Sequence, residues 1–179
     1  MRVVTGSARG KPLKAPQGRD TRPSSASTKE TMFSAVQFDI VDSVVLDLFA
    51  GSGQLGIEAL SRGAKFAYFC DINPEALSVV KSNLSYTKLS ESAFVKKLPW
   101  YTFLKLLKAE IDLAFIDPPF EQGLIESALV AIVPKMTSRG IIVCEHEEKL
   151  QPPNEVDTYK LTKTYNCGSS TISIYRNTK

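Results

Sequence analysis

The chain has 179 residues, of which 43% are apolar, and a formal net charge of +3. This length and apolar content suffice for one sizeable core but not for a second full domain. No apolar run approaches the roughly 20 residues that cross a membrane, and the amino terminus lacks the apolar region of a signal peptide, so we expect a cytoplasmic protein. The three cysteines are far apart and the single histidine has no partner at metal-ligand spacing, which argues against a disulfide framework and a metal site.

Charge is distributed unevenly along the chain. Residues 1–30 hold seven basic and two acidic side chains, a net charge of +5, whereas the other 149 residues hold 15 basic and 17 acidic ones, a net charge of −2. A basic segment on a near-neutral body is typical of proteins that bind a polyanion, although a solvated tail has the same composition. We expect residues 1–27 to form a basic arm and residues 28–179 the main domain. The candidate contacts with such a polyanion are Arg2, Arg9, Lys11, Lys14, Arg19 and Arg22.

Strand and helix patterns follow one another along the chain. Short strands at 2–5 and 11–14 would pair as a hairpin, and the spacing of Ser27 and Glu30 indicates a capping box for a helix over 28–41. The strands expected next lie at 44–49, 66–71, 92–96, 111–116 and 140–145. The helices between them lie at 53–62, 74–86, 99–109 and about 121–135. Two closing strands, at 159–164 and 171–175, are joined by a turn.

This order of elements predicts the fold class. Alternation of strands and helices calls for a parallel sheet with helices on both faces, and the closing hairpin forces one antiparallel strand into that sheet. We therefore expect a Rossmann-like, doubly wound α/β fold with seven strands, mostly parallel and with the last one antiparallel, preceded by an N-terminal β-hairpin arm.

A glycine loop follows the first strand of the alternating region. Gly51, Gly53 and Gly56 match G-x-G-x-x-G, and Asp71 lies 20 residues beyond Gly51, which first indicates a dinucleotide site. In such a site a pyrophosphate binds at the helix N-terminus, and the carboxylate of Asp47, four residues before Gly51, would repel it. S-adenosylmethionine has no phosphate and carries an ammonium next to its sulfonium. Asp47 therefore favours S-adenosylmethionine as the cofactor.

Asp71 ends the second strand, where its carboxylate can accept hydrogen bonds from two ribose hydroxyls. Asn73 and Pro74 already supply an N-cap and a first helical residue, which leaves Asp71 available to the ligand. The predicted cofactor contacts lie around these two strand ends: Asp47, Phe49, Ala50, Gly51, Ser52, Gly53, Asp71, Ile72 and Leu98.

A second loop, Asp117-Pro118-Pro119-Phe120, follows the fourth strand. The Asp117 carboxylate and the Pro118 carbonyl can accept hydrogen bonds from the two N–H groups of an exocyclic amine on a planar base. These bonds turn the nitrogen lone pair toward an electrophile. Phe120 can stack on the base. Holding nitrogen, methyl carbon and sulfur in line can contribute up to roughly 7–11 kcal/mol, and no covalent enzyme intermediate is needed. Asp117, Pro118 and Phe120 are therefore the candidate catalytic residues.

With both motifs in place, the chain closely resembles the bacterial RsmD family of 16S ribosomal RNA guanine-N2 methyltransferases. The similarity extends over residues 3–13, Arg22-Pro23-Ser24, residues 29–33, the two central motifs and the closing residues 163–175. The resemblance implies a class I S-adenosylmethionine-dependent methyltransferase that methylates the exocyclic N2 amine of one guanine in 16S ribosomal RNA. The implied partner is ribosomal RNA of the small subunit, naked or in an assembling particle. We expect a monomer that binds no membrane and no metal.

Three positions depart from the family's pattern. Ala26 and Ser27 stand where the linker usually has an acid and an arginine. The segment after the third strand reads Lys97-Leu98-Pro99-Trp100, where the family usually has an Asp or Asn that hydrogen-bonds the adenine amine, so we expect packing and backbone groups to hold the adenine. Asn73 replaces an acid that commonly follows the ribose-binding one.

Other functions fit the same residues. Related D/N-P-P-aromatic loops act on adenine N6, cytosine N4 and a protein glutamine amide, and nothing in the loop itself separates guanine from adenine. A non-catalytic RNA-binding protein is the alternative from another class, and the missing adenine contact is its support. An Asp-Pro turn that merely ends a strand is the structural alternative for Asp117.

Overall fold

The chain alternates between strands and helices, as the sequence predicts. In the computed structural model, which describes residues 1–16, 26–120 and 122–179, the strands are β1 (Val44–Asp47), β2 (Phe66–Asp71), β3 (Ala93–Lys97), β4 (Ile111–Ile116), β5 (Met136–Glu147), β6 (Glu155–Val156), β7 (Tyr159–Asn166) and β8 (Ser170–Asn177). The helices are α1 (Ala26–Ala35), α2 (Gln54–Ser61), α3 (Pro74–Thr87), α4 (Trp100–Leu106) and α5 (Leu124–Ile132), with 3₁₀ turns η1 (Ser90–Ser92) and η2 (Val133–Lys135).

These strands form one mixed sheet in the order β3-β2-β1-β4-β5-β8-β7-β6. Strands β1 to β5 are parallel, and β8 inserts between β5 and β7, antiparallel to both. The prediction of a mostly parallel sheet whose last strand is antiparallel is confirmed. The sheet has one strand more than the seven expected. This strand, β6, pairs with β7, and its two residues are too few for a sequence pattern to indicate.

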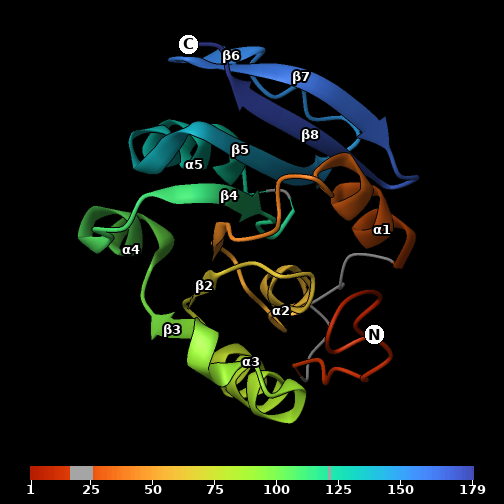
Figure 1. The fold of residues 1–179 in the computed structure, drawn as a ribbon. Helices are drawn as coiled ribbons and strands as arrows, with labels where there is room; N and C mark the ends of the chain where they lie inside the picture. Colours follow the sequence, from red (N-terminus) through yellow and green to blue (C-terminus); the bar gives the residue numbers. More distant parts are fainter. Residues whose placement is uncertain (17–25, 121) are drawn as a thin grey trace.

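Helices cover both faces of the sheet, with α1, α2 and α3 on one side and α4 and α5 on the other (Figure 1). Alternate residues of each strand point to opposite faces. Val45 and Val143 are buried in the apolar cluster that includes residues of α1, α2 and α3, whereas Leu46 and Ile142 are buried in the cluster with α4 and α5. A doubly wound sheet of this kind binds ligands beyond the carboxyl ends of its strands.

The first helix differs from the prediction at both ends. Because α1 already contains Ala26, Ser27 lies inside the helix, and the predicted capping box is wrong. The helix ends at Ala35 rather than at 41, and a turn follows in which the Asp39 N–H donates to the Val36 carbonyl. Ile40 is buried from the connecting segment, so apolar spacing continued past the end of the helix.

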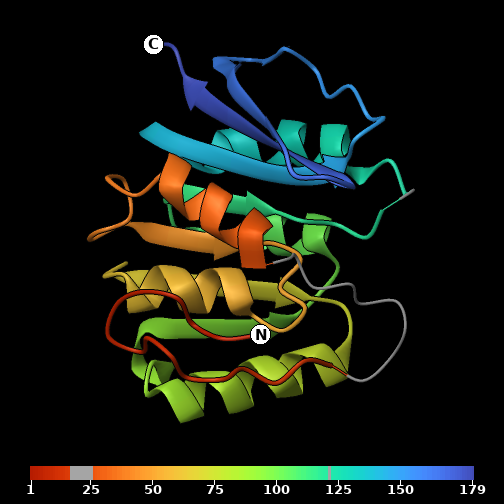
Figure 2. The same ribbon diagram turned by 90° about the vertical axis from the view of Figure 1, so that its right-hand side faces the viewer.

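Residues 1–16 lie across α2 and α3 (Figure 2). The expected hairpin is present in reduced form, with one antiparallel bridge between Arg2 and Pro12 and a backbone hydrogen bond from Val3 N–H to the Lys11 carbonyl. Other backbone donors of this segment point instead to side chains of α2 and α3. Val3, Ala8 and Leu13 are buried in the apolar cluster on the α2 and α3 side. These sixteen residues are therefore fixed to the folded body. None of the helices in the described part of the chain is long and apolar enough to cross a membrane.

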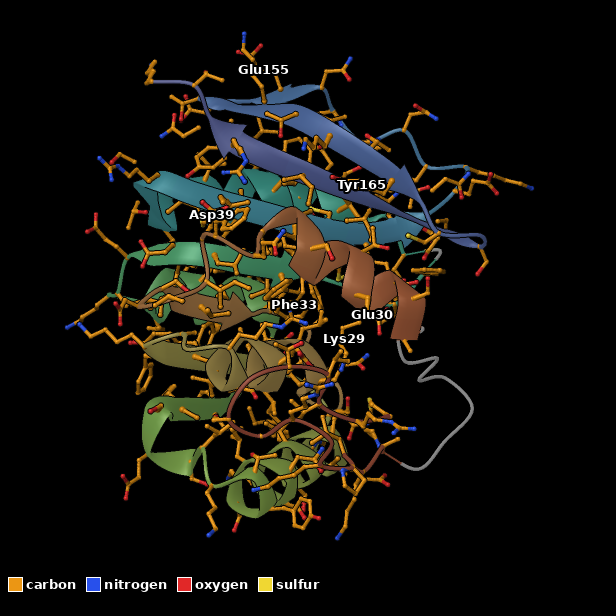
Figure 3. The ribbon with its side chains drawn as sticks, turned by 45° about the vertical axis from the view of Figure 1, so that its right-hand side comes forward. Lys29, Glu30, Phe33, Asp39, Glu155 and Tyr165 are labelled. Carbon is orange, nitrogen blue, oxygen red and sulfur yellow. The ribbon has the colours of Figure 1, made fainter. Side chains whose placement is uncertain are left out.

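A buried cluster of charges, the Glu58 cluster, ties residues 1–16 and α1 to α2. The two carboxylate oxygens of Glu58 accept the backbone N–H groups of Val4 and Thr5 at 2.8 and 2.9 Å. The Lys29 ammonium lies 3.1 Å from one oxygen and the Arg62 guanidinium 2.9 Å from the other. Lys29 lies on the side of α1 that faces the N-terminal segment (Figure 3). Lys29 is thus part of the core, and its charge does not contribute to a basic surface.

Candidate active site

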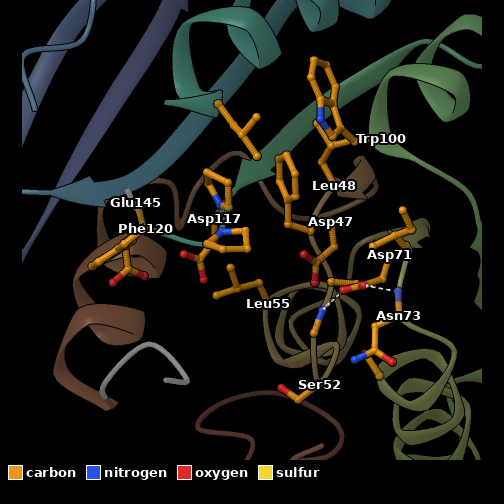
Figure 4. Close-up of a pocket in the computed structure, with 18 of the residues that line it drawn as sticks. Asp47, Leu48, Ser52, Leu55, Asp71, Asn73, Trp100, Asp117, Phe120 and Glu145 are labelled. Atoms are coloured by element: carbon orange, nitrogen blue, oxygen red, sulfur yellow. Dashed lines mark hydrogen bonds between the residues drawn. The ribbon is translucent and has the colours of Figure 1, made fainter. Parts of the chain in front are cut away.

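A cavity of about 990 Å³ opens beyond the carboxyl ends of β1, β2, β4 and β5 (Figure 4). The predicted cofactor loop and the predicted catalytic loop both line it. Of the nine predicted cofactor contacts, eight line this cavity: Asp47, Phe49, Ala50, Gly51, Ser52, Asp71, Ile72 and Leu98. The ninth, Gly53, belongs to the same loop as the N-cap of α2 but does not line the cavity.

The glycine loop makes a tight turn between β1 and α2. Gly51 and Gly53 have φ angles of 51° and 76°, a region of backbone conformation that glycine adopts without steric cost. The Gly53 N–H donates to the Ala50 carbonyl at 2.6 Å, which closes the turn. The Gly56 N–H, in the first turn of α2, donates to Asp47 Oδ2 at 3.0 Å. The start of α2 therefore fixes the carboxylate that ends β1.

Asp47 is buried at the base of the cavity, only 2% exposed. Burial raises the pKa of its carboxyl to about 7, the Gly56 hydrogen bond opposes that rise, and the nearby charge of Asp71 adds to it. A buried carboxylate of this kind binds a cationic ligand group well, because the ligand supplies the charge that the interior lacks.

We expect S-adenosylmethionine to bind roughly ten times more tightly at pH 7.5 than at pH 6, because Asp47 with a pKa of about 7 is mostly protonated at pH 6. The upper limit is pH 7.5 because α-amino groups lose their own charge near pH 7.7–8.0. Isothermal titration calorimetry across this range measures the effect. A pH-independent affinity would contradict the contact between Asp47 and the ammonium group.

The variant Asp47→Asn is the control, since it keeps an oxygen acceptor for the Gly56 N–H and removes the titration. Its cofactor affinity should be weak and flat with pH. Folding raises the pKa of Asp47 from 3.8 to about 7. The protonated side chain therefore contributes stability that is fully present below about pH 3.8 and is lost as the pH rises through about 7. Relative to the wild type, the ligand-free Asn variant should therefore gain thermal stability at pH 8 and gain little at pH 4.

Asp71 lies at the end of β2, beside the glycine loop. Its two carboxylate oxygens accept the backbone N–H groups of Gly51 and Asn73, both at 2.8 Å. Asn73 caps α3 by accepting the Glu75 N–H, and Pro74 is the first helical residue, as predicted. The sequence pattern left Asp71 available to the ligand and did not predict its two backbone hydrogen bonds. Each carboxylate oxygen can accept a second hydrogen bond, so Asp71 retains capacity for two ribose hydroxyls.

The side of the cavity next to Asp71 is apolar and aromatic. Ile72, Leu98 and Trp100 line it, and the Trp100 ring lies 6.2 Å from the ring of Phe49. Trp100 was not among the predicted contacts, although it is the only tryptophan of the chain and directly follows the segment that contains Leu98. These side chains offer flat apolar surfaces on which an adenine ring could pack.

Asp117, Pro118 and Phe120 also line the cavity, beyond the end of β4. Figure 4 shows Asp117 facing the cavity between Asp47 and Phe120. Phe120 is 38% exposed, so its ring is accessible at the cavity mouth. The catalytic residues predicted from sequence thus share one cavity with the predicted cofactor residues. They follow β4, the strand that pairs with β1, which Asp47 ends.

Glu145 is a residue of this cavity that the sequence analysis missed. It lies near the end of β5 and is 5% exposed, and its Oε2 atom has no hydrogen-bond partner within residues 1–16, 26–120 and 122–179. A buried carboxylate oxygen without a partner costs free energy, and such an atom in a native structure calls for an explanation, of which a role in binding or catalysis is one. Its position at the end of an apolar strand, the position that Asp47, Asp71 and Asp117 occupy, was the available signal.

The predicted RNA contacts are only partly brought together. Arg2, Arg9 and Lys14 are exposed on the N-terminal segment. Lys11 is half-buried and donates to the Tyr86 and Thr87 carbonyls at the end of α3, both at 3.3 Å. Arg19 and Arg22 lie outside the described residues.

Both the sequence and the fold are similar to those of known proteins. The model of a family described as Conserved hypothetical protein 95 matches residues 1–176. "Putative rRNA methyltransferase YlbH" of Bacillus subtilis is 35% identical over 98% of this chain and 98% of its own length. "Ribosomal RNA small subunit methyltransferase D" of Haemophilus influenzae is 33% identical over 99% of this chain and 94% of its own length.

A solved structure titled "Putative methyltransferase yhhF from Escherichia coli" has a TM-score of 0.86 and 29% identity to this chain. The similarity covers 99% of this chain and 97% of the solved one. The predicted fold, that of the class I methyltransferases, is therefore confirmed by both the strand order and this similarity.

Proposed function

We propose, given that the chain belongs to the RsmD family, described as Conserved hypothetical protein 95, that it methylates ribosomal RNA of the small subunit with S-adenosylmethionine. The acceptor is the exocyclic N2 amine of one guanine in 16S ribosomal RNA. One observation carries this proposal: the Asp47 loop, the Asp71 strand end and the Asp117 loop line a single cavity. The names of the two relatives support ribosomal RNA as the substrate.

The charged groups of the cavity lining fit this cofactor. Four carboxylates line the cavity, those of Asp47, Asp71, Asp117 and Glu145, and its described lining contains no lysine or arginine. A pyrophosphate would find only repulsion there, whereas a ligand with an ammonium, a sulfonium and two ribose hydroxyls finds acceptors. Asp47 would hold the ammonium, Asp71 the ribose, and Ile72, Leu98 and Trp100 the adenine. The bound cofactor supplies an activated methyl group.

The chain's own groups position the acceptor. The Asp117 carboxylate and the Pro118 carbonyl each accept a hydrogen bond from the amine. These two bonds hold the nitrogen with its lone pair toward the methyl carbon. Phe120 stacks on the base and fixes its plane. The nitrogen carries an extra proton after transfer, and the Asp117 carboxylate accepts it at the open side of the cavity. Most of the rate enhancement then comes from positioning and from hydrogen bonds that strengthen as charge develops.

Mapping the methylated nucleoside tests the proposal. Small-subunit particles and naked 16S ribosomal RNA from a strain without the gene are incubated with the purified protein and labelled S-adenosylmethionine, digested, and analysed by mass spectrometry. We expect N2-methylguanosine at one position. Methylation of adenine or of protein would contradict the acceptor, and tight binding of NADH without binding of S-adenosylmethionine would contradict the cofactor.

We further propose that residues 1–27 hold the RNA backbone while residues 28–179 perform the chemistry. Replacing Arg2, Arg9 and Lys14 with alanine should flatten the plot of log affinity against log salt by about two units, from roughly −0.7 per single-strand phosphate contact. Filter binding of the ribosomal RNA at several salt concentrations measures the slope. Methylation at saturating RNA should fall less than affinity does, because these side chains do not line the cavity.

Lys160 provides the matched control for the salt experiment. It is exposed on β7, near the opposite edge of the sheet, and pairs with Glu155. Lys160→Ala should leave the slope unchanged. An unchanged slope in the triple variant as well would show that the RNA is held by other surfaces.

A further inference from the structure

Glu145 occupies a position next to the predicted catalytic loop. Strands β4 and β5 are parallel neighbours, and Ile116 pairs in register with Cys144. The following residues, Asp117 and Glu145, therefore stand side by side at the same edge of the sheet, at the strand spacing of about 4.8 Å. Ile116 and Cys144 are both buried toward α4 and α5, so the alternation of the strands directs Asp117 and Glu145 to the opposite face.

The Glu145 carboxylate is held in the cavity without satisfying its hydrogen-bonding capacity. The residue is 5% exposed, and Oε2 has no partner among the described residues. Figure 4 shows Glu145 on the same side of the cavity as Phe120 and Asp117, away from Asp71 and Asn73. It therefore lies on the acceptor side, where the cofactor contacts are not found.

We infer that Glu145 determines the base specificity of the enzyme by accepting the N1–H of guanine while Asp117 accepts the adjacent N2 amine. This inference rests on the proposed function. An ionised carboxylate is only an acceptor, and guanine presents two neighbouring donors, N1–H and the N2 amine, to two neighbouring carboxylates. Guanine thus supplies the partner that Oε2 lacks.

The same geometry rejects the other acceptors of related loops. Adenine has a lone pair on N1 beside its N6 amine, cytosine has one on N3 beside its N4 amine, and a glutamine amide has its carbonyl oxygen there. Each would place an acceptor against the buried Glu145 carboxylate and leave that charge without a donor. Specificity then comes from repulsion of the wrong base as well as from a bond to the right one.

A base analogue tests this inference. In the RNA substrate, 2-aminopurine replaces the target guanosine; it keeps the exocyclic amine and has a lone pair in place of N1–H. The wild-type enzyme should methylate the analogue with a kcat/KM about 10 to 100 times lower. Glu145→Ala should lose a similar factor on guanosine and nothing further on the analogue, so that the two RNAs differ by less than about threefold.

Three controls accompany this comparison. Glu145→Gln keeps an acceptor oxygen and should recover part of the rate on guanosine. Glu148→Gln, which changes an exposed carboxylate outside the cavity, should keep the full wild-type preference. S-adenosylmethionine affinity should be the same in all variants, since Glu145 lies away from the predicted cofactor contacts.

Two results would overturn the inference. One is a Glu145→Ala enzyme that retains the wild-type preference for guanosine. The other is an equal loss on both RNAs, which would indicate a role that does not depend on the base edge. Failure of the proposed function is seen separately, because the wild-type enzyme would then methylate no guanine in either the particle or the naked RNA.

Discussion

Replacing Asp117 with alanine should lower the rate of methyl transfer by about two to three orders of magnitude and leave S-adenosylmethionine affinity within about twofold of the wild type. The carboxylate contributes most when positive charge develops on the attacking nitrogen, and the predicted cofactor contacts lie on other strands. Single-turnover transfer from labelled cofactor to saturating RNA measures the chemical step, and calorimetry measures cofactor binding.

Phe120→Ala provides the contrast with Asp117→Ala. Its ring is 38% exposed at the cavity mouth, and its loss should weaken engagement of the base by about 1–3 kcal/mol. That variant should need more RNA for half-maximal rate and should approach wild-type transfer when RNA saturates. A fully active Asp117→Ala enzyme would mean that the loop only ends β4, as an ordinary Asp-Pro turn would.

The cavity could be predicted in large part because the carboxyl ends of the parallel strands that line it can be located in the sequence. Asp47, Asp71 and Asp117 each follow a short apolar run and precede a turn or helix signal, and their meeting at one edge follows from parallel topology alone. The confirmed prediction of a mostly parallel sheet with an antiparallel last strand required no knowledge of side-chain contacts. The hydrogen bonds from Gly51 and Asn73 to Asp71 could not be predicted, since they depend on how two separate loops approach each other.

Glu145 escaped prediction because its burial comes from distant residues. In the sequence it opens a polar stretch with His146 and Glu147, which reads as the exposed end of a strand. In the structure β8 pairs along this end of β5, and residues from the β7–β8 turn line the same cavity. The place of Glu145 at the end of an apolar strand was a local signal, but its burial by a strand that follows 25 residues later was not.

The N-terminal segment was predicted only in part, for a related reason. Its local pattern suggested two strands paired with each other, yet the backbone donors of Val4 and Thr5 bind Glu58 and those of Ser7 and Ala8 bind Ser61. Local strand propensity gave way to contacts with a helix some 50 residues away. The net charge of residues 1–30 also overstated the basic surface, because Lys29 is buried against Glu58.

The Glu58 cluster should be the most sensitive point of the fold. Glu58→Gln keeps the shape of the side chain but leaves the Lys29 ammonium buried without a counter-charge, and it places an amide donor among groups that are all donors. Loss of one partner of a buried pair costs about 3–5 kcal/mol in unfolding free energy. For a domain of this size we expect the melting temperature to fall by about 10 °C.

Thermal and urea denaturation of matched variants checks the Glu58 prediction. Glu155→Gln removes an exposed pair with Lys160 and should change the unfolding free energy by less than about 1 kcal/mol. Glu58→Gln combined with Lys29→Met removes the uncompensated charge and should recover part of the loss. Because Glu58 lies on α2, whose first turn holds Asp47 through Gly56, the single variant should also bind S-adenosylmethionine more weakly before it unfolds. A melting temperature equal to that of Glu155→Gln would show that the buried charges contribute no more than a surface pair.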